Sequence, residues 1–133
     1  MIGLLIVTHC DLGAELLNAA QFIVGKIDNA DTVPITETTG SEKIRKIIEE
    51  RVNALNTGDG VIILTDMFGG TPSNLSLSFL KKEKIEVLTG VNLPMIIAII
   101  QNRPKLNIDA VAEKAQEAGR NGISLASKLL ESS

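Results

Sequence analysis

The chain has 133 residues, of which 44% are hydrophobic and 22% are charged, with a formal net charge of −3. This length and balance are typical of a single globular domain, here residues 1–133. The negative charge and the scarcity of aromatic residues (three Phe, no Trp or Tyr) exclude a basic, ring-lined surface, so we expect no nucleic-acid partner.

The first part of the chain alternates strand patterns with helical ones. Residues 2–7 form a continuous apolar block, typical of a strand buried on both faces of a parallel sheet. Helical apolar spacing follows over residues 12–25. Residues 31–35 predict a weaker strand, which Pro34 places near a sheet edge or a strand end. An amphipathic helix over residues 41–55 follows, capped by the serine that begins it.

The second part continues this alternation. A buried strand is predicted at residues 61–66, a loop and helix at 69–80, a strand at 85–90 and a short apolar helix at 93–102. Four strands that alternate with helices through short links predict an α/β fold. We expect an open, doubly wound, mainly parallel sheet of four strands with helices on both faces.

The end of the chain is less distinct. A more polar helix is predicted over residues 108–122, and residues 123–130 fit a strand or a helix equally. The longest apolar run, Met95 to Ile100, is far shorter than the roughly 20 residues that cross a bilayer. A single Cys10 cannot form an internal disulfide. These features predict a cytoplasmic protein that is not inserted in a membrane.

Polar side chains follow three of the predicted strands. The strand ends read "THCD", "TDMFGGTP" and "TGVNLP" and contain His9, Asp66 and Asn92 respectively. Carboxyl ends of parallel strands meet at one edge of the sheet, where open α/β sheets bind their ligands. His9, the only histidine, therefore stands where this architecture places functional groups.

The same residues suggest one chemistry. A histidine acts as a nucleophile when one ring nitrogen is unprotonated and the other is held by an acceptor. Asp66 would be that acceptor, because its strand is expected beside the first. Gly69 and Gly70 would let the backbone approach a phosphoryl group, and Thr71 would add a hydroxyl. Together these residues fit a phosphohistidine intermediate.

Each residue also has a purely structural explanation. His9 would then be a solvated side chain at a strand end, and Asp66 would only accept loop amides. Thr71 before Pro72 would cap a helix, as would Asp11 at the first helix, where its carboxylate would compete with an anion. The residues alone leave these alternatives open.

Other chemistries lack their usual residues. One histidine beside one cysteine cannot supply a zinc site, and the chain has no phosphate-binding loop, dinucleotide fingerprint or serine-hydrolase elbow. A catalytic Cys10 would lack a second histidine or a resolving cysteine. We therefore expect no metal and no organic cofactor.

Three segments in register carry a family resemblance: "GLLIVTHCDLGAELLNAAQFIVG", "GVIILTDMFGGTPSNLS" and "VLTGVNLPMIIAII". They resemble the IIA domain of mannose, fructose and sorbose type permeases of the bacterial phosphoenolpyruvate-dependent sugar phosphotransferase system. The likeness spans nearly the whole chain. It implies that His9 accepts a phosphoryl group from the histidine-containing phosphocarrier protein and passes it to a IIB component.

The resemblance also assigns the neighbouring residues. Asp66 would hydrogen-bond the imidazole and orient it. The expected phosphate contacts are Thr71, Gly69, Gly70, the backbone of Cys10, and Asn92. Cys10 departs from the glycine expected after the histidine.

The same resemblance implies a homodimer in which residues 122–127, "GISLAS", form a short antiparallel strand exchanged between subunits. The protein would be peripheral to a membrane permease. An alternative role is a standalone regulatory phosphoacceptor that controls a kinase or a transcription regulator. A further alternative is a small-molecule binder with an unphosphorylated His9. The residues do not specify the sugar.

Overall fold

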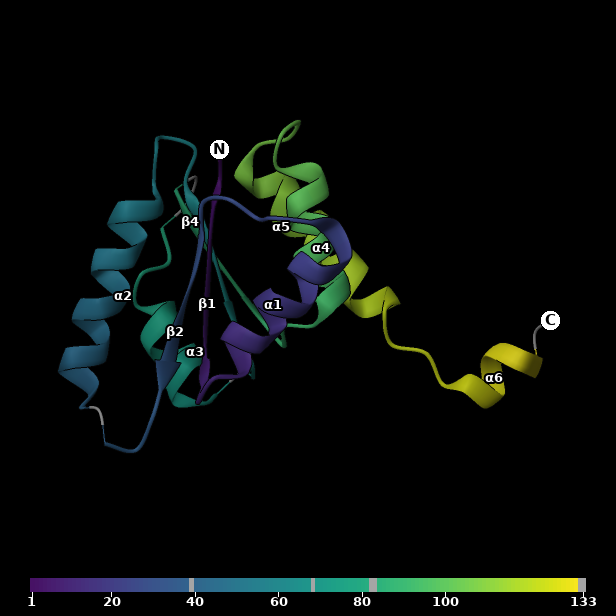
Figure 1. Ribbon diagram of the computed structural model, residues 1–133, viewed down its shortest axis with the longest axis horizontal. Coiled ribbons are helices and arrows are strands. Elements are labelled where there is room, and N and C mark those ends of the chain that lie inside the picture. The colour runs from purple at the N-terminus through teal and green to yellow at the C-terminus, as the bar shows by residue number, and fades with distance from the viewer. Residues whose placement is uncertain (39, 68, 82–83, 132–133) are drawn as a thin grey trace.

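The computed structural model describes residues 1–38, 40–67, 69–81 and 84–131. Four strands form one sheet: β1 (Gly3–His9), β2 (Ala30–Ile35), β3 (Val61–Thr65) and β4 (Ile85–Thr89). The helices are α1 (Leu12–Val24), α2 (Ser41–Leu55), α3 (Thr71–Leu77), α4 (Leu93–Asn102), α5 (Ile108–Asn121) and α6 (Ala126–Glu131). The predicted alternation of strands and helices is confirmed (Figure 1).

The strand order is β2-β1-β3-β4, and all neighbouring strands are parallel. β2 lies at an edge, as Pro34 predicted, because proline has no N–H for a ladder on its second side. From β1 the chain moves to one side to form β2 and then returns to the other side to form β3. The strand order therefore reverses between β1 and β3, which makes their carboxyl ends the topological switch point.

Helices cover both faces of the sheet. α1, α4 and α5 lie on one face, and α2 and α3 lie on the other (Figure 1). Along β1, Leu4 and Ile6 pack toward the first group of helices, whereas Leu5 and Val7 pack toward the second. All four side chains are fully buried, which explains why this strand is apolar without alternation.

Two predicted helix caps are wrong. Ser41 is the first helical residue of α2, and Gly40 occupies the N-cap position without a side-chain bond. Asp11 occupies the N-cap position of α1, but its carboxylate makes no capping bond. Instead, the Thr8 hydroxyl accepts a hydrogen bond of 2.8 Å from the backbone N–H of Gly13. A buried hydroxyl at the strand end thus replaces the exposed carboxylate.

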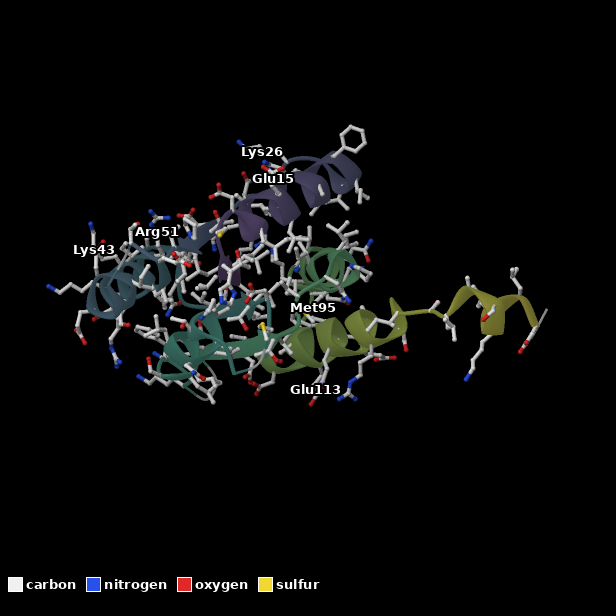
Figure 2. The ribbon with its side chains drawn as sticks, turned by 90° about the horizontal axis from the view of Figure 1, so that it is seen from below. Glu15, Lys26, Lys43, Arg51, Met95 and Glu113 are labelled. Carbon is white, nitrogen blue, oxygen red and sulfur yellow. The ribbon has the colours of Figure 1, made fainter. Side chains whose placement is uncertain are left out.

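Charged side chains project from the surface, and apolar side chains fill the interior. In Figure 2, which views the molecule from below Figure 1, Lys43 and Arg51 project outward from α2 and Glu113 projects from α5. Met95 of α4 lies in the interior and is 4% exposed. Among the described residues, no helix is long and apolar enough to span a bilayer.

The C-terminal segment does not form the expected strand. Residues 123–125 have no regular structure, and α6 stands apart from the sheet and its helices (Figure 1). Within the described residues, no strand pairs with residues 122–127. Four apolar side chains of this segment are more than 60% exposed: Ile123, Leu125, Leu129 and Leu130.

Candidate functional site

His9 and Asp66 come together at the switch point of the sheet. His9 is the last residue of β1, and Asp66 directly follows β3. The side chain of His9 is 49% exposed, whereas that of Asp66 is only 12% exposed. The fold therefore presents the imidazole to solvent and holds the carboxylate behind it.

The Asp66 carboxylate is fixed by three N–H donors. Its Oδ2 lies 2.7 Å from Nδ1 of His9 and accepts the backbone N–H of the same residue at 3.0 Å. Its Oδ1 accepts the backbone N–H of Met67, also at 3.0 Å. Because both oxygens are engaged, the carboxylate can hold the imidazole in one orientation.

These contacts determine which ring nitrogen is free. Partial burial raises the pKa of Asp66, but the hydrogen bonds from His9 and Met67 outweigh it, and the net effect is a lowered pKa. Asp66 is therefore ionised at neutral pH and acts only as an acceptor. Nδ1 of His9 must then carry the proton in the 2.7 Å contact, which leaves the lone pair on Nε2.

Gly70 lies directly against the imidazole. A Cβ atom added to Gly70 would be 3.2 Å from Cε1 of His9, the ring carbon between the two nitrogens. The absence of a side chain thus lets this backbone approach the ring. Gly70 occupies the N-cap position of α3, and Thr71 is the exposed first residue of that helix. The capping role considered for Thr71 is wrong, because no side-chain capping bond forms there.

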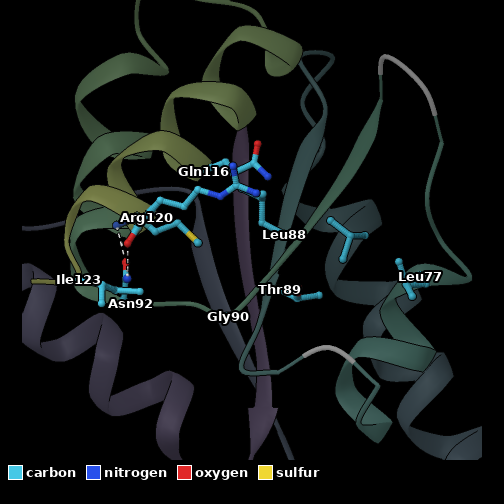
Figure 3. Close-up of a pocket in the computed structure, with 11 residues that line it drawn as sticks. Leu77, Leu88, Thr89, Gly90, Asn92, Gln116, Arg120 and Ile123 are labelled. Carbon is cyan, nitrogen blue, oxygen red and sulfur yellow. Dashed lines mark hydrogen bonds between the residues drawn. The ribbon is translucent and has the colours of Figure 1, made fainter.

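The structure argues against two of the expected phosphate contacts. The backbone N–H of Cys10 donates to the carbonyl of Ile35 at 2.9 Å, so it is not available to an anion. Asn92 caps α4: its Oδ1 accepts the Met95 N–H at 3.1 Å, and its Nδ2 donates to the Gly119 carbonyl at 2.9 Å (Figure 3). Both ends of this amide are engaged in holding α4 and α5 together.

Sequence reasoning missed the contribution of Thr8. Its buried hydroxyl holds the start of α1 next to His9, through the bond to Gly13. A weak signal was present, because a threonine shortly before a helix is a capping residue. Asp11, closer to the helix, masked that signal.

The chain matches the family model EIIA-man, described as "PTS system fructose IIA component", over residues 3–116. It is 30% identical over 124 residues to the PTS system mannose-specific EIIAB component of Escherichia coli (strain K12), covering 92% of this chain. The chain spans only 38% of the length of that relative. It is 25% identical over 132 residues to the PTS system fructose-specific EIIA component of Bacillus subtilis (strain 168), covering 98% of this chain and 90% of the relative.

A solved structure shares the fold. The crystal structure of the phosphotransferase system component EIIA from Streptococcus agalactiae superposes with a TM-score of 0.87 at 26% identity. The match covers 96% of this chain and 99% of that one. The range matched by the family model includes His9, Asp66 and Gly70.

Proposed function

Because this chain belongs to the EIIA-man family of sugar phosphotransferase system IIA components, we propose that it carries a phosphoryl group on His9. The donor would be the histidine-containing phosphocarrier protein. The acceptor would be a IIB component, which serves sugar uptake with phosphorylation. We place this transfer in the cytoplasm, beside a membrane permease. The 2.7 Å contact between His9 and Asp66 is the observation that carries the proposal.

The transfer exchanges one phosphorus–nitrogen bond for another. Nε2 of His9 attacks the phosphorus in line as the bond to the donor imidazole breaks, and the electron pair of that bond returns to the donor ring. His9 then bears a positive ring charge with Nδ1 still protonated. Asp66 stabilises this charge and keeps the ring oriented. Onward transfer reverses the same steps and requires no metal or organic cofactor.

We also propose that the phosphoryl oxygens lie against Gly69, Gly70 and Thr71. Gly70 is already beside the imidazole, and Thr71 presents an exposed side chain on the next residue. Gly69 adopts a φ of +86°, a conformation that suits glycine in the turn before α3.

Intact-protein mass spectrometry tests the proposal. The protein is incubated with phosphoenolpyruvate, the first enzyme of the system and the phosphocarrier, in parallel with His9→Ala. We expect one acid-labile phosphoryl group on the wild type and none on the variant. Subsequent addition of a IIB component should remove the group from the wild type.

The outcomes separate the steps of the proposal. Full phosphorylation of His9→Ala would overturn the assignment of His9. Phosphorylation without onward transfer to any IIB component would contradict the carrier role and favour a regulatory phosphoacceptor.

We further propose a homodimer in which residues 122–127 add as an antiparallel strand to β4 of a second copy. β4 is an edge strand. Ile85 at its start already pairs with Lys81 through two backbone hydrogen bonds, so the added strand would pair beyond Ile85. A groove of about 410 Å³ runs between Leu88 of β4 and Gln116 and Arg120 of α5 (Figure 3). The exposed Ile123 lines the same groove.

Light scattering after size-exclusion chromatography tests the dimer. We expect twice the chain mass for the wild type and one chain mass after Leu125→Asp, which places a charge in the added strand. A monomeric wild type at micromolar concentration would overturn the dimer without affecting phosphorylation of His9.

A further inference from the structure

Three buried hydroxyl groups lie in α3 and at the end of β3. Ser73 and Ser76 of α3 and Thr65 at the end of β3 are all 0% exposed. Within the described residues, none of their three hydroxyl oxygens has a hydrogen-bond partner. Buried polar groups are normally paired, and an unpaired one raises the free energy of the conformation that contains it.

The predicted helix forms, but the polar and apolar residues at its end do not follow helical spacing. Residues 74–79 read "NLSLSF", a strict alternation of polar and apolar residues that is typical of a strand. In α3, Leu75 is partly buried and Leu77 is 37% exposed. In the turn that follows, Phe79 is partly buried and Leu80 is 53% exposed. A seven-residue helix also has little intrinsic stability. α3 is therefore held less firmly than the long, amphipathic α2 beside it.

α3 is also the element that adjoins the proposed phosphoryl group. Gly70 and Thr71 begin this helix, and Gly70 lies against the His9 ring. Asp66, which contacts the same ring through Nδ1, is fixed by three N–H donors. A phosphoryl group adds between one and two negative charges, so the loosely held side of the site is the side that can respond.

We propose that α3 is a conformational device that shifts when His9 is phosphorylated, with Ser73 and Ser76 keeping it weakly packed. The shift lets Gly70 and Thr71 follow the phosphoryl oxygens and lets the buried hydroxyls find partners. Phosphorylation thereby changes the surface next to His9, so that the two states differ for any protein that docks there. The inference rests on the proposed function.

Hydrogen exchange followed by mass spectrometry tests the shift on the full chain, before and after phosphorylation as above. We expect the amides of residues 74–77, which lie beyond the first turn of α3, to exchange about tenfold or more faster than those of α2 in the unphosphorylated protein. Phosphorylation should change their exchange rates at least about threefold and leave α5 unchanged. If the mass shows that His9 is phosphorylated but α3 exchanges at the same rate in both states, the inference is overturned and the proposed function still stands.

Ser→Ala variants test the cause of the weak packing. Ser73→Ala and Ser76→Ala remove unpaired hydroxyls, so each should raise Tm by about 2–5 °C and slow exchange in α3. Ser78→Ala is the matched control on the same segment, because its exposed hydroxyl donates to the Leu75 carbonyl at 2.6 Å. That variant should lower Tm slightly or leave it unchanged.

The Tm values of these variants test the packing of α3 without any phosphoryl donor. A lower Tm for both Ser73→Ala and Ser76→Ala would show that the hydroxyls stabilise α3, which would overturn the inference even if His9 is phosphorylated. Failure of the wild type to gain a phosphoryl group would instead overturn the proposed function, and the inference with it.

Discussion

The two ends of the sheet use their polar groups in opposite ways. At the amino end, the buried Arg103 donates to the carbonyls of Ile2, Asp28 and Asn29 at 3.0, 2.6 and 3.4 Å. The Asn29 side chain donates in turn to the carbonyls of Met1 and Leu55. At the carboxyl end, by contrast, the imidazole of His9 is half exposed, and among the described residues its hydrogen-bond partner is Asp66, on Nδ1.

This difference indicates that polar groups at the amino end stabilise the fold, whereas those at the carboxyl end remain available for a reaction. Donors at the amino end bond to backbone carbonyls next to the first residues of β1 and β2, so they contribute to folding. At the carboxyl end, one side of the imidazole is held and the other is left open to a ligand. Substitutions at the amino end should therefore affect stability, and those at the carboxyl end should affect phosphoryl transfer.

Asp66→Asn should give the largest effect at the carboxyl end. All three neighbours of the carboxylate are N–H donors, so an amide must turn its NH₂ group toward one of them. We expect phosphoryl acceptance by His9 to slow about 100-fold or more, measured by rapid-quench mass spectrometry. Asp31→Asn, on β2, is the matched control and should accept phosphate at the wild-type rate. Equal rates for both variants would contradict the orienting role of Asp66.

Arg103→Met tests the amino end. The methionine keeps part of the buried volume but removes the Arg103 donor from three carbonyls, of which that of Asn29 keeps the Leu4 N–H at 3.1 Å. We expect a loss of about 2–4 kcal/mol in chemical denaturation. Arg51→Met is the control, because the Arg51 side chain is 42% exposed and pairs with Asp31 at the surface. It should cost less than about 1 kcal/mol. Slower phosphoryl transfer in folded Arg103→Met would contradict the expectation that substitutions at the amino end affect stability and not transfer.

The strand and helix pattern, the parallel sheet and the neighbouring positions of His9 and Asp66 were predictable from the sequence. Apolar periodicity identifies these elements, and parallel strands bring their carboxyl ends to one edge. The family resemblance supplied the roles of the site residues, and those roles remain proposals.

Hydrogen-bond partners near the strand ends were harder to predict. Thr8 and Asp11 compete to cap α1, and the choice depends on a geometry that sequence spacing does not encode. The same holds for the Cys10 amide and Asn92, which sit at the predicted edge but bond to Ile35 and Gly119. Location at a functional edge therefore did not establish that a residue faces the ligand.

The two ends should also differ in their response to acid. The pKa of Asp66 is lowered in the folded protein, so its stabilisation is fully present above the unfolded-state pKa of about 3.9. It is lost as the pH falls through the lower folded-state pKa. We expect the Tm difference between wild type and Asp66→Asn to shrink from pH 6 to pH 3. The difference between wild type and Arg103→Met, which involves a guanidinium charged throughout this range, should persist.

The smallest predicted effect comes from a backbone conformation that both ends share. Cys10 and Asn29 each have a φ of +51°, a left-handed conformation that costs most non-glycine residues about 1–2 kcal/mol. Asn29 offsets this cost with its hydrogen bonds to Met1 and Leu55, so Asn29→Gly should lower stability by about 1–2 kcal/mol. Cys10→Gly relieves the strain and should raise stability by about 0.5–1 kcal/mol, after the entropy of glycine is subtracted.

Chemical denaturation of both variants measures these opposite signs. If Cys10→Gly instead destabilises the protein, the cysteine side chain itself must stabilise the loop beside His9. Side chains at the carboxyl end would then also contribute to the free energy of unfolding, and the contrast between the two ends would be smaller. If the signs are opposite, the same backbone conformation is supported by side-chain hydrogen bonds at one end and is carried as strain next to the reactive imidazole at the other.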